Sequence, residues 1–281
     1  MFNLNSNRIT FLSGCSFSAY NIIFSGGRTT NTGVIRPTSA TGYFSGCVFS
    51  GCSFTSNGIL FQNQNVDRLE IEDCIFSGNS IAGNIACMYR AGNGYTTFSS
   101  CTFTENRANR YTVFSVAGAG TFTVADCTFT LNSVTTNMPI IVTTSTKAIF
   151  ERCVFSANSS TEKNKNGRVF ILGGTPTLID CHVEPLESSP TAGIYTSATC
   201  QCNISGGTYG TVQNTGTTHI SGSVAFTYIS SGTVNIASGT SIALTNNMSC
   251  TAINVDGVCY VNGASVAAGT YTNISSDGTA T

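Results

Sequence analysis

The chain has 281 residues, of which only 9% are charged, and its formal net charge is −1. Ordinary globular domains carry roughly 25% charged residues, so Ser, Thr, Asn and Gly must supply most of this surface, and nothing in the charge favours a nucleic-acid partner. The sequence has neither a long apolar run nor an apolar segment near residue 1, which argues against membrane insertion and against a signal peptide in these residues.

A short motif, Cys-x-Phe-x-x-Asn, recurs along the chain, and its first partial copy is at Cys15 and Phe17. Residues 25–42 then form a long polar excursion. Two overlapping phrases follow, one starting at Cys47 and one at Cys52. The copy at Cys52 is favoured, because only that copy has an Asn five residues later.

Residues 52–181 contain the regular part of the repeat, and from Cys74 onward its steps are 26 to 28 residues. The predicted structural ladder consists of Cys52, Cys74, Cys101, Cys127, Cys153 and Cys181, of Phe54, Phe76, Phe103, Phe129 and Phe155, and of Asn57, Asn79, Asn106, Asn132 and Asn158. Cys and Phe are two residues apart, so both lie on one face of a strand. An apolar residue stands three positions before each Cys, and this odd step requires a bend. Asn tolerates left-handed backbone, and its amide can bond the turn of the next repeat.

A second apolar run follows each Asn, so each period holds two or three short strands separated by Gly, Asn, Ser and Thr turns. One such unit cannot bury its own apolar face, whereas stacked units share a core. The sequence therefore predicts an all-β fold, a single-stranded right-handed parallel β-helix of about ten coils. A left-handed form is disfavoured because the strict hexapeptide repeat is missing.

Around residue 200 the period shortens to 16 or 17 residues. We expect wide coils over residues 1–200 and a narrower continuation of the same β-helix over residues 201–281. No capping helix is predicted at either end. Uncapped parallel coils can add end to end, so self-association into a filament or another homo-oligomer is one expectation.

Most of the 13 cysteines fall on the repeat, and a ladder of buried, reduced thiols is the favoured interpretation. A few disulfides remain the alternative, involving Cys47, Cys200, Cys250 or Cys259. No metal site is predicted, because Cys200-x-Cys202 lacks a second pair at zinc spacing, and no cofactor is predicted.

Charged residues suggest two further sites. Asp73, Asp126 and Asp180 precede ladder cysteines, with Arg152 between them; they fit turn residues better than a glycosidase pair. His182 takes a variable outward position and His219 is an isolated strand residue, and no catalytic role is predicted for either. Five basic residues should project from one edge, either for solubility or as a site for an anionic ligand: Arg107, Arg110, Lys163, Lys165 and Arg168.

The five copies of Cys-x-Phe-x-x-Asn between Cys52 and Asn158 resemble the Phe-x-x-Asn repeat of the polymorphic outer-membrane protein family, whose passengers are autotransporter-type β-helix adhesins. The companion Gly-Gly-Ala-Ile phrase is missing. The resemblance implies a non-enzymatic structural or adhesive solenoid, extracellular or on the cell surface, with a glycan or cell-surface ligand. The alternative is a carbohydrate-active β-helix such as a polysaccharide lyase, a hydrolase or a phage tailspike. The chain is then either a piece of a longer protein or exported without a signal peptide of its own.

Overall fold

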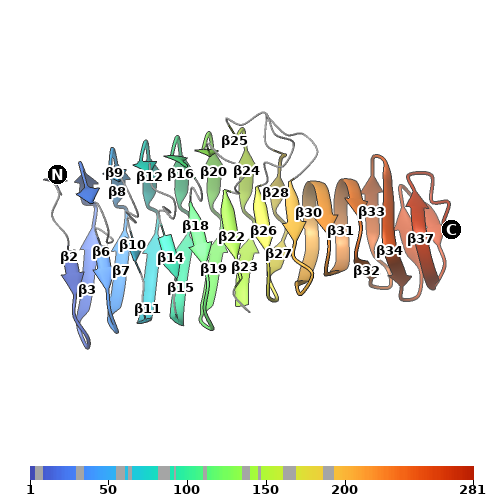
Figure 1. Ribbon diagram of the computed structural model, residues 1–281, viewed down its shortest axis with the longest axis horizontal. Coiled ribbons are helices and arrows are strands. Elements are labelled where there is room, and N and C mark those ends of the chain that lie inside the picture. Colours follow the sequence, from blue (N-terminus) through green and yellow to red (C-terminus); the bar gives the residue numbers. More distant parts are fainter. Residues whose placement is uncertain are drawn as a thin grey trace.

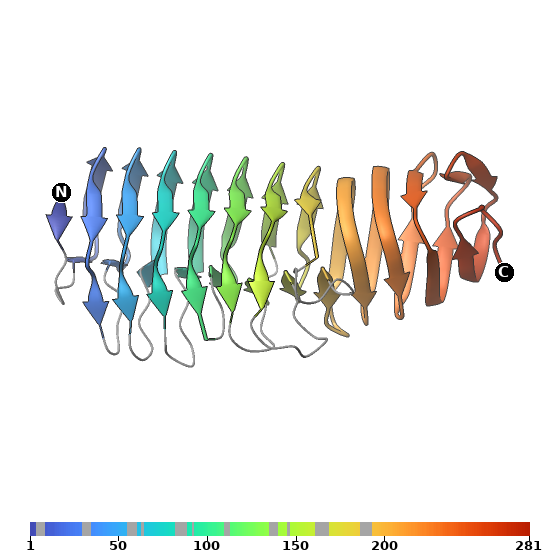
Figure 2. The same ribbon diagram turned by 90° about the horizontal axis from the view of Figure 1, so that it is seen from above.

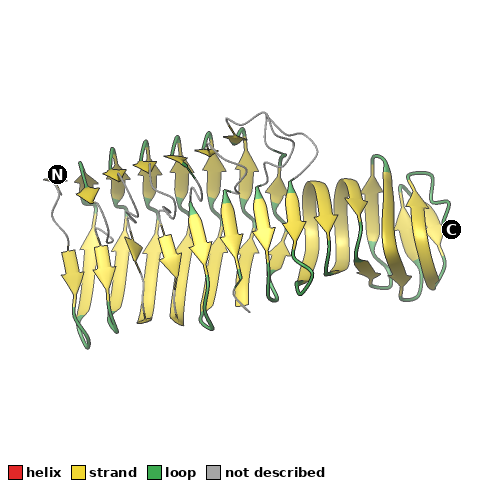
Figure 3. Cartoon of the chain, in the orientation of Figure 1, coloured by secondary structure: helices red, strands yellow, loops and turns green. Residues whose placement is uncertain are grey.

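The computed structural model describes residues 1–3, 9–29, 35–54, 61–62, 65–81, 89–91, 93–109, 113–134, 140–144, 147–160, 169–185 and 193–281. These residues form strands and turns without a helix, and most strands are parallel in one large sheet (Figure 3). In this part of the chain there is accordingly no helix long and apolar enough to cross a membrane.

Three rows of strands build the first two thirds of the 31-stranded sheet. The long row is β3 (Ser16–Tyr20), β7 (Thr41–Ser45), β11 (Asn65–Glu72), β15 (Asn93–Ser99), β19 (Thr121–Ala125), β23 (Lys147–Glu151) and β27 (Thr177–Ile179). The Phe row is β1 (Phe2–Asn3), β4 (Ile23–Ser25), β8 (Val48–Ser50), β12 (Ile75–Ser77), β16 (Thr102–Thr104), β20 (Thr128–Thr130), β24 (Val154–Ser156) and β28 (His182–Val183). The third row is β2 (Ile9–Phe11), β6 (Ile35–Pro37), β10 (Phe61–Gln62), β14 (Tyr89–Ala91), β18 (Phe114–Val116), β22 (Ile141–Thr143), β26 (Phe170–Leu172) and β29 (Ile194–Thr196).

All three rows continue into one long strand, β30 (Gln201–Asn214). The strands that follow are β31 (Thr217–Ser230), β32 (Thr233–Ile236), β33 (Ser241–Leu244), β34 (Asn247–Val255), β35 (Cys259–Val261), β36 (Ala264–Val266) and β37 (Gly269–Ser275). A separate six-stranded sheet contains β5 (Arg28–Thr29), β9 (Ser53–Phe54), β13 (Ser80–Ile81), β17 (Arg107–Ala108), β21 (Ser133–Val134) and β25 (Ser159–Ser160).

Equivalent strands of successive repeats pair in parallel, which stacks the repeats into an elongated column with the termini at opposite ends (Figures 1 and 2). Phe103 pairs with Phe129, 26 residues later. Beyond residue 200 the step shortens, and Tyr209 pairs with Phe226, 17 residues later. The repeats are therefore narrower where the sequence period is shorter.

Two corners of each repeat are made by residues with positive φ. One corner directly precedes the position of the ladder Cys, which Ile22 occupies in the first repeat, at Asn21, Gly46, Asp73, Ser100, Asp126, Arg152 and Asp180. The other directly precedes the ladder Asn position, at Gly26, Gly51, Gly78, Glu105, Leu131 and Ala157. The bend predicted before Cys is confirmed. The expectation that Asn itself takes the left-handed conformation is wrong, because the preceding residue does.

The core is a stack of phenylalanines from the Phe row. Phe24, Phe49, Phe76, Phe103, Phe129 and Phe155 stack with nearly parallel rings at centroid distances of 4.4–4.9 Å. This offset geometry adds about 0.5–1.5 kcal/mol per pair to the burial of each ring. The predicted ladder of Phe76, Phe103, Phe129 and Phe155 is confirmed.

The predicted first copy of the ladder is wrong. Phe49, not Phe54, pairs with Phe76, so Cys47 and not Cys52 precedes the ladder Phe. Cys52 takes the Asn position instead, and its N–H donates to Asn79 Oδ1 at 3.0 Å. Phe54 pairs with Ile81 in the six-stranded sheet, and Asn57 lies outside the described residues. A step from Cys52 to Cys74 is too short for one full turn of three strands, whereas the step from Cys47 equals the later ones.

The C-terminal end of the column is closed by strands rather than left open. Strand β37 pairs antiparallel with β34. The outer edge of β37 is in turn bonded by the last residues, since Thr272 N and Asn273 N donate to Thr281 O at 2.7 and 3.0 Å. The expected uncapped C-terminal coil is thus wrong: part of its outer strand edge is already hydrogen-bonded, and covering an edge in this way hinders edge-to-edge association.

Candidate functional site

The buried asparagines form a continuous hydrogen-bonded ladder along one corner. Asn106 Oδ1 accepts from the backbone N–H of Asn79 at 3.1 Å and from Asn79 Nδ2 at 3.0 Å. Asn106 Nδ2 donates to Phe76 O and to Asn132 Oδ1, both at 2.9 Å. The same pattern joins Asn132 to Asn158. The predicted amide bonding between repeats is confirmed for Asn79, Asn106, Asn132 and Asn158, and this corner is structural.

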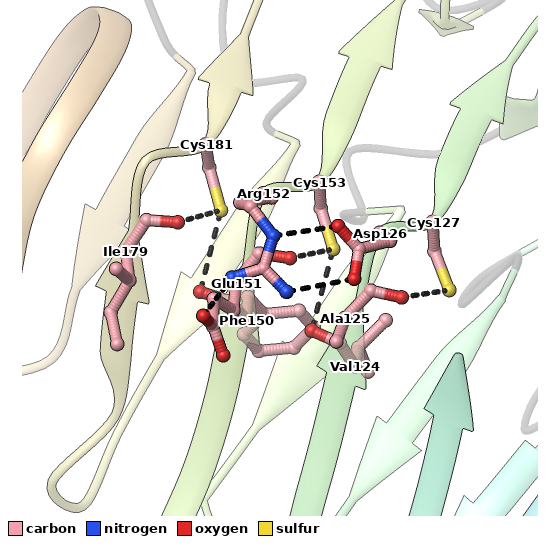
Figure 4. Close-up of polar contacts among 10 residues, drawn as sticks. All are labelled: Val124, Ala125, Asp126, Cys127, Phe150, Glu151, Arg152, Cys153, Ile179 and Cys181. Carbon is pink, nitrogen blue, oxygen red and sulfur yellow. Dashed lines mark hydrogen bonds and ion pairs between the residues drawn. The ribbon is translucent and has the colours of Figure 1, made fainter. Parts of the chain in front are cut away.

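The ladder cysteines are buried free thiols, as are all but Cys15 of the described cysteines. Figure 4 shows Cys127, Cys153 and Cys181 side by side, each Sγ donating to the carbonyl two residues earlier, at 3.2–3.4 Å. Hydrogen bonds between neighbouring thiols, and burial after them, raise the pKa of Cys74, Cys127 and Cys181, while the same hydrogen bonds lower the pKa of the intervening Cys101 and Cys153. Burial raises the pKa of Cys200 to about 11 and of Cys250 to about 12. Because thiolate is the reactive form, Cys200 and Cys250 serve as small apolar groups.

Asp73, Asp126 and Asp180, called the acidic row, lie on the corners before the ladder cysteines. One of them, Asp126, forms an ion pair. Arg152 Nε and Nη2 bond Asp126 Oδ1 and Oδ2 at 2.7 and 2.8 Å, and Arg152 also contacts Glu151 (Figure 4). The hydrogen bonds from Arg152 lower the pKa of Asp126. A carboxylate so held stays ionised and is a poor general acid.

Replacing Arg152 by Met should raise the pKa of Asp126 toward the ordinary aspartate value. Because the folded pKa is depressed, the ion pair contributes stability above the ordinary value, and this contribution is lost as the pH falls through the folded pKa. Both groups are about half exposed, so the effect on stability is small. A carboxyl NMR titration measures the shift, with Arg68→Met, which removes only the Arg68–Glu70 pair, as the control. An unchanged titration of Asp126 would contradict the assignment.

The proposed basic edge is largely outside the described residues. Arg110, Lys163, Lys165 and Arg168 lie there, and only Arg107 is placed, exposed on β17. The anionic-ligand hypothesis for these residues remains a prediction.

A wide hollow lies on the outward face of the narrow repeats, where no sequence motif was found. It measures about 640 Å³ over β30, β31, β33 and β35, and an adjoining hollow of about 290 Å³ extends to β28. The two share Thr208, Ala225, Ala243 and Asn262, and together are called the trough. Its floor is low because the outward positions carry small side chains, here mainly Ala, Gly, Ser and Thr.

Larger side chains stand at both ends of the trough. At the C-terminal end Tyr260 is 44% exposed, and Asn262 is fixed by bonds from its Nδ2 to Leu244 O and Ser276 O, both 2.7 Å. At the other end His182 Nε2 and Glu184 Oε1 lie 3.3 Å apart. The sequence analysis predicts no role for His182. The signal for a polar pair was Glu184, which follows two residues later and therefore lies on the same side of an extended chain.

A row of hydrogen-bonded polar side chains crosses strands β31, β32, β34 and β37 of the narrow repeats. Thr270 Oγ1 donates to Asn254 Oδ1, Asn254 Nδ2 donates to Asn235 Oδ1, and Asn235 Nδ2 lies 3.4 Å from His219 Nδ1. His219 is thus one member of a hydrogen-bonded row. Within the described residues, no group of three His, Cys, Asp or Glu side chains is placed to hold a metal ion.

No protein-family model matches the chain, and no curated protein and no solved structure is significantly similar to it.

Proposed function

We propose that the chain is a right-handed parallel β-helix of about ten coils that acts as an extracellular or cell-surface adhesive element and binds a carbohydrate in the trough. The right hand follows the strong preference of parallel β-connections. The observation that carries the proposal is the trough itself, with an exposed tyrosine beside a floor of small residues. A large concave site with a few polar groups is the default binding site of a protein.

The residues of the trough suit a short chain of sugars, because its two ends lie four strand spacings apart, about 19 Å. The face of Tyr260 offers an apolar surface for ring C–H groups, while Glu184, His182 and Thr208 offer hydrogen-bonding groups. A shallow trough on a rigid stack of strands holds a ligand without requiring conformational change. Binding rather than chemistry is proposed, because the best placed carboxylate of the acidic row, Asp126, is held by Arg152.

End-to-end assembly into a filament is the weaker alternative. It would need a free strand edge at each end of the column, and the outer edge of β37 is occupied by residues near Thr281. A carbohydrate-active enzyme is the other alternative, and release of reducing ends from the sugar tested would favour it over an adhesin.

Replacing Tyr260 by Ala should weaken sugar binding about tenfold, the effect of losing roughly 1.4 kcal/mol of stacking. Calorimetric titration measures the affinity for trisaccharide probes. The neutral probes are cellotriose, chitotriose and laminaritriose, and the acidic probe is trigalacturonate. Tyr95→Ala is the matched control, because Tyr95 is an exposed tyrosine on β15, away from the trough. Absence of binding to every probe at millimolar concentration, or equal binding by Tyr260→Ala, would contradict the proposal.

A further inference from the structure

The outward face of the Phe row carries a regular chemical pattern that continues into the trough. On six successive strands, β4 to β24, the first outward position is always β-branched: Ile23, Val48, Ile75, Thr102, Thr128 and Val154. The second outward position, two residues later, always carries a hydroxyl: Ser25, Ser50, Ser77, Thr104, Thr130 and Ser156. These twelve residues are called the methyl–hydroxyl array.

The two columns of the array are aligned by the strand register. Ile75 pairs with Val48 and Thr102, and Ser77 pairs with Ser50 and Thr104. Neighbours within a column are therefore about 4.8 Å apart, and the two columns are separated by about 6.6 Å, twice the rise per residue. The array is thus a flat grid with one methyl-bearing group and one hydroxyl on every strand.

The array is uncharged although it faces solvent. Ile75 is 42% exposed and Val154 is 37% exposed. On the neighbouring long row the outward positions are mixed: β11 and β23 carry charged residues such as Glu70 and Glu151, whereas β15 and β19 carry uncharged ones such as Thr97. The array thus differs from the long row in carrying no charge on any of its six strands, and exposed apolar groups gathered on such a neutral face are typical of a binding surface.

The array and the trough belong to one continuous surface. Val154 of the last array strand pairs with His182 of β28, and His182 pairs with Thr208 on the floor of the trough. A ligand that leaves the trough along the column axis meets the array next. The corners that border the array carry Asp73, Asp126 and Asp180 with Arg152 as the one basic residue among them, and this net negative row disfavours a polyanion.

We propose that the array binds an extended, uncharged β-linked polysaccharide that lies along the column, one sugar on each strand, with one end of the bound segment in the trough. Ring C–H groups contact the β-branched column, and ring hydroxyls exchange hydrogen bonds with the Ser and Thr column. Each strand contributes little, but tethered contacts add along the chain. The proposal rests on the carbohydrate binding assigned above to the trough.

The test compares short and long neutral oligosaccharides on one protein. Wild-type affinity for cello- or chito-oligosaccharides should rise about tenfold or more between three and eight sugars. The double variant Thr102→Lys/Thr128→Lys should abolish this gain and leave three-sugar binding unchanged. The matched control, Thr97→Lys/Thr123→Lys, places the same charges on paired outward positions of the long row and should keep the gain. Circular dichroism and melting temperature show that each variant is folded.

The outcomes separate the array from the trough. If Tyr260→Ala weakens three-sugar binding but affinity does not grow with length, carbohydrate binding stands and the array proposal is overturned. The array proposal is also overturned if both lysine pairs reduce long-chain binding equally. If no three-sugar probe binds, and eight-sugar probes bind only through Thr102 and Thr128, the trough assignment fails and the array remains.

Discussion

Replacing Asn106 by Ala should lower the free energy of unfolding by about 3–5 kcal/mol. The substitution removes four hydrogen bonds of a fully buried amide. It also leaves the backbone N–H of Asn79 and the carbonyl of Phe76 without their side-chain partner, and each buried unsatisfied group costs about 1–3 kcal/mol.

Urea unfolding followed by circular dichroism measures the loss as a shift of the midpoint at constant slope. Asn246→Ala is the matched control, because Asn246 is exposed and donates only through its backbone, to Thr227 O. A loss for Asn106→Ala within about 1 kcal/mol of the control would show that the amide ladder contributes little. A changed slope would instead indicate that unfolding of the column had become stepwise, as repeat proteins allow.

Replacing Phe103 by Ala should destabilise the protein by about 3–5 kcal/mol through lost burial and a cavity inside the stack. Phe103 is fully buried and lies between Phe76 and Phe129, at centroid distances of 4.6 and 4.7 Å. It also meets Phe114 edge-on at 5.1 Å. The rings on both sides belong to other repeats, so they cannot close the cavity without shifting their strands.

Phe103→Leu separates size from the loss of ring stacking, since it keeps most of the apolar volume and should cost clearly less than Phe103→Ala. The same urea experiment gives both values, and a cavity in the alanine variant should also make amide exchange faster in β12 and β20 than in β37. Equal stability of Phe103→Ala and wild type would mean that the stack of rings is not the main source of cohesion.

The repeat could be recognised in the sequence because the Cys, Phe and Asn of each copy lie within six residues of one another. Cys, Phe and Asn at fixed offsets specify which side of a short strand points inward, and four Phe and four Asn positions were placed correctly on this basis. The copy near Cys52 was misassigned because its local match, with Asn57 at the right offset, is better than that at Cys47. The length of chain needed for one turn of three strands decides this register, and that length is a property of the neighbouring repeats.

The sequence by itself determined the stacking of equivalent strands and the identity of the buried ladders, because inward positions obey the two-residue period of a strand and the 26-residue period of the repeat. Which side chains gather on the outer surface could be seen only in the folded chain. The trough and the methyl–hydroxyl array are columns of residues that lie 17 to 28 positions apart in the chain. The buried pairs Tyr209 and Phe226, and Phe155 and Val183, show this spacing on the inward side of the same strands. Such columns exist only once strand pairing sets the register. The closure of β37 likewise depends on a chain reversal that no repeat predicts.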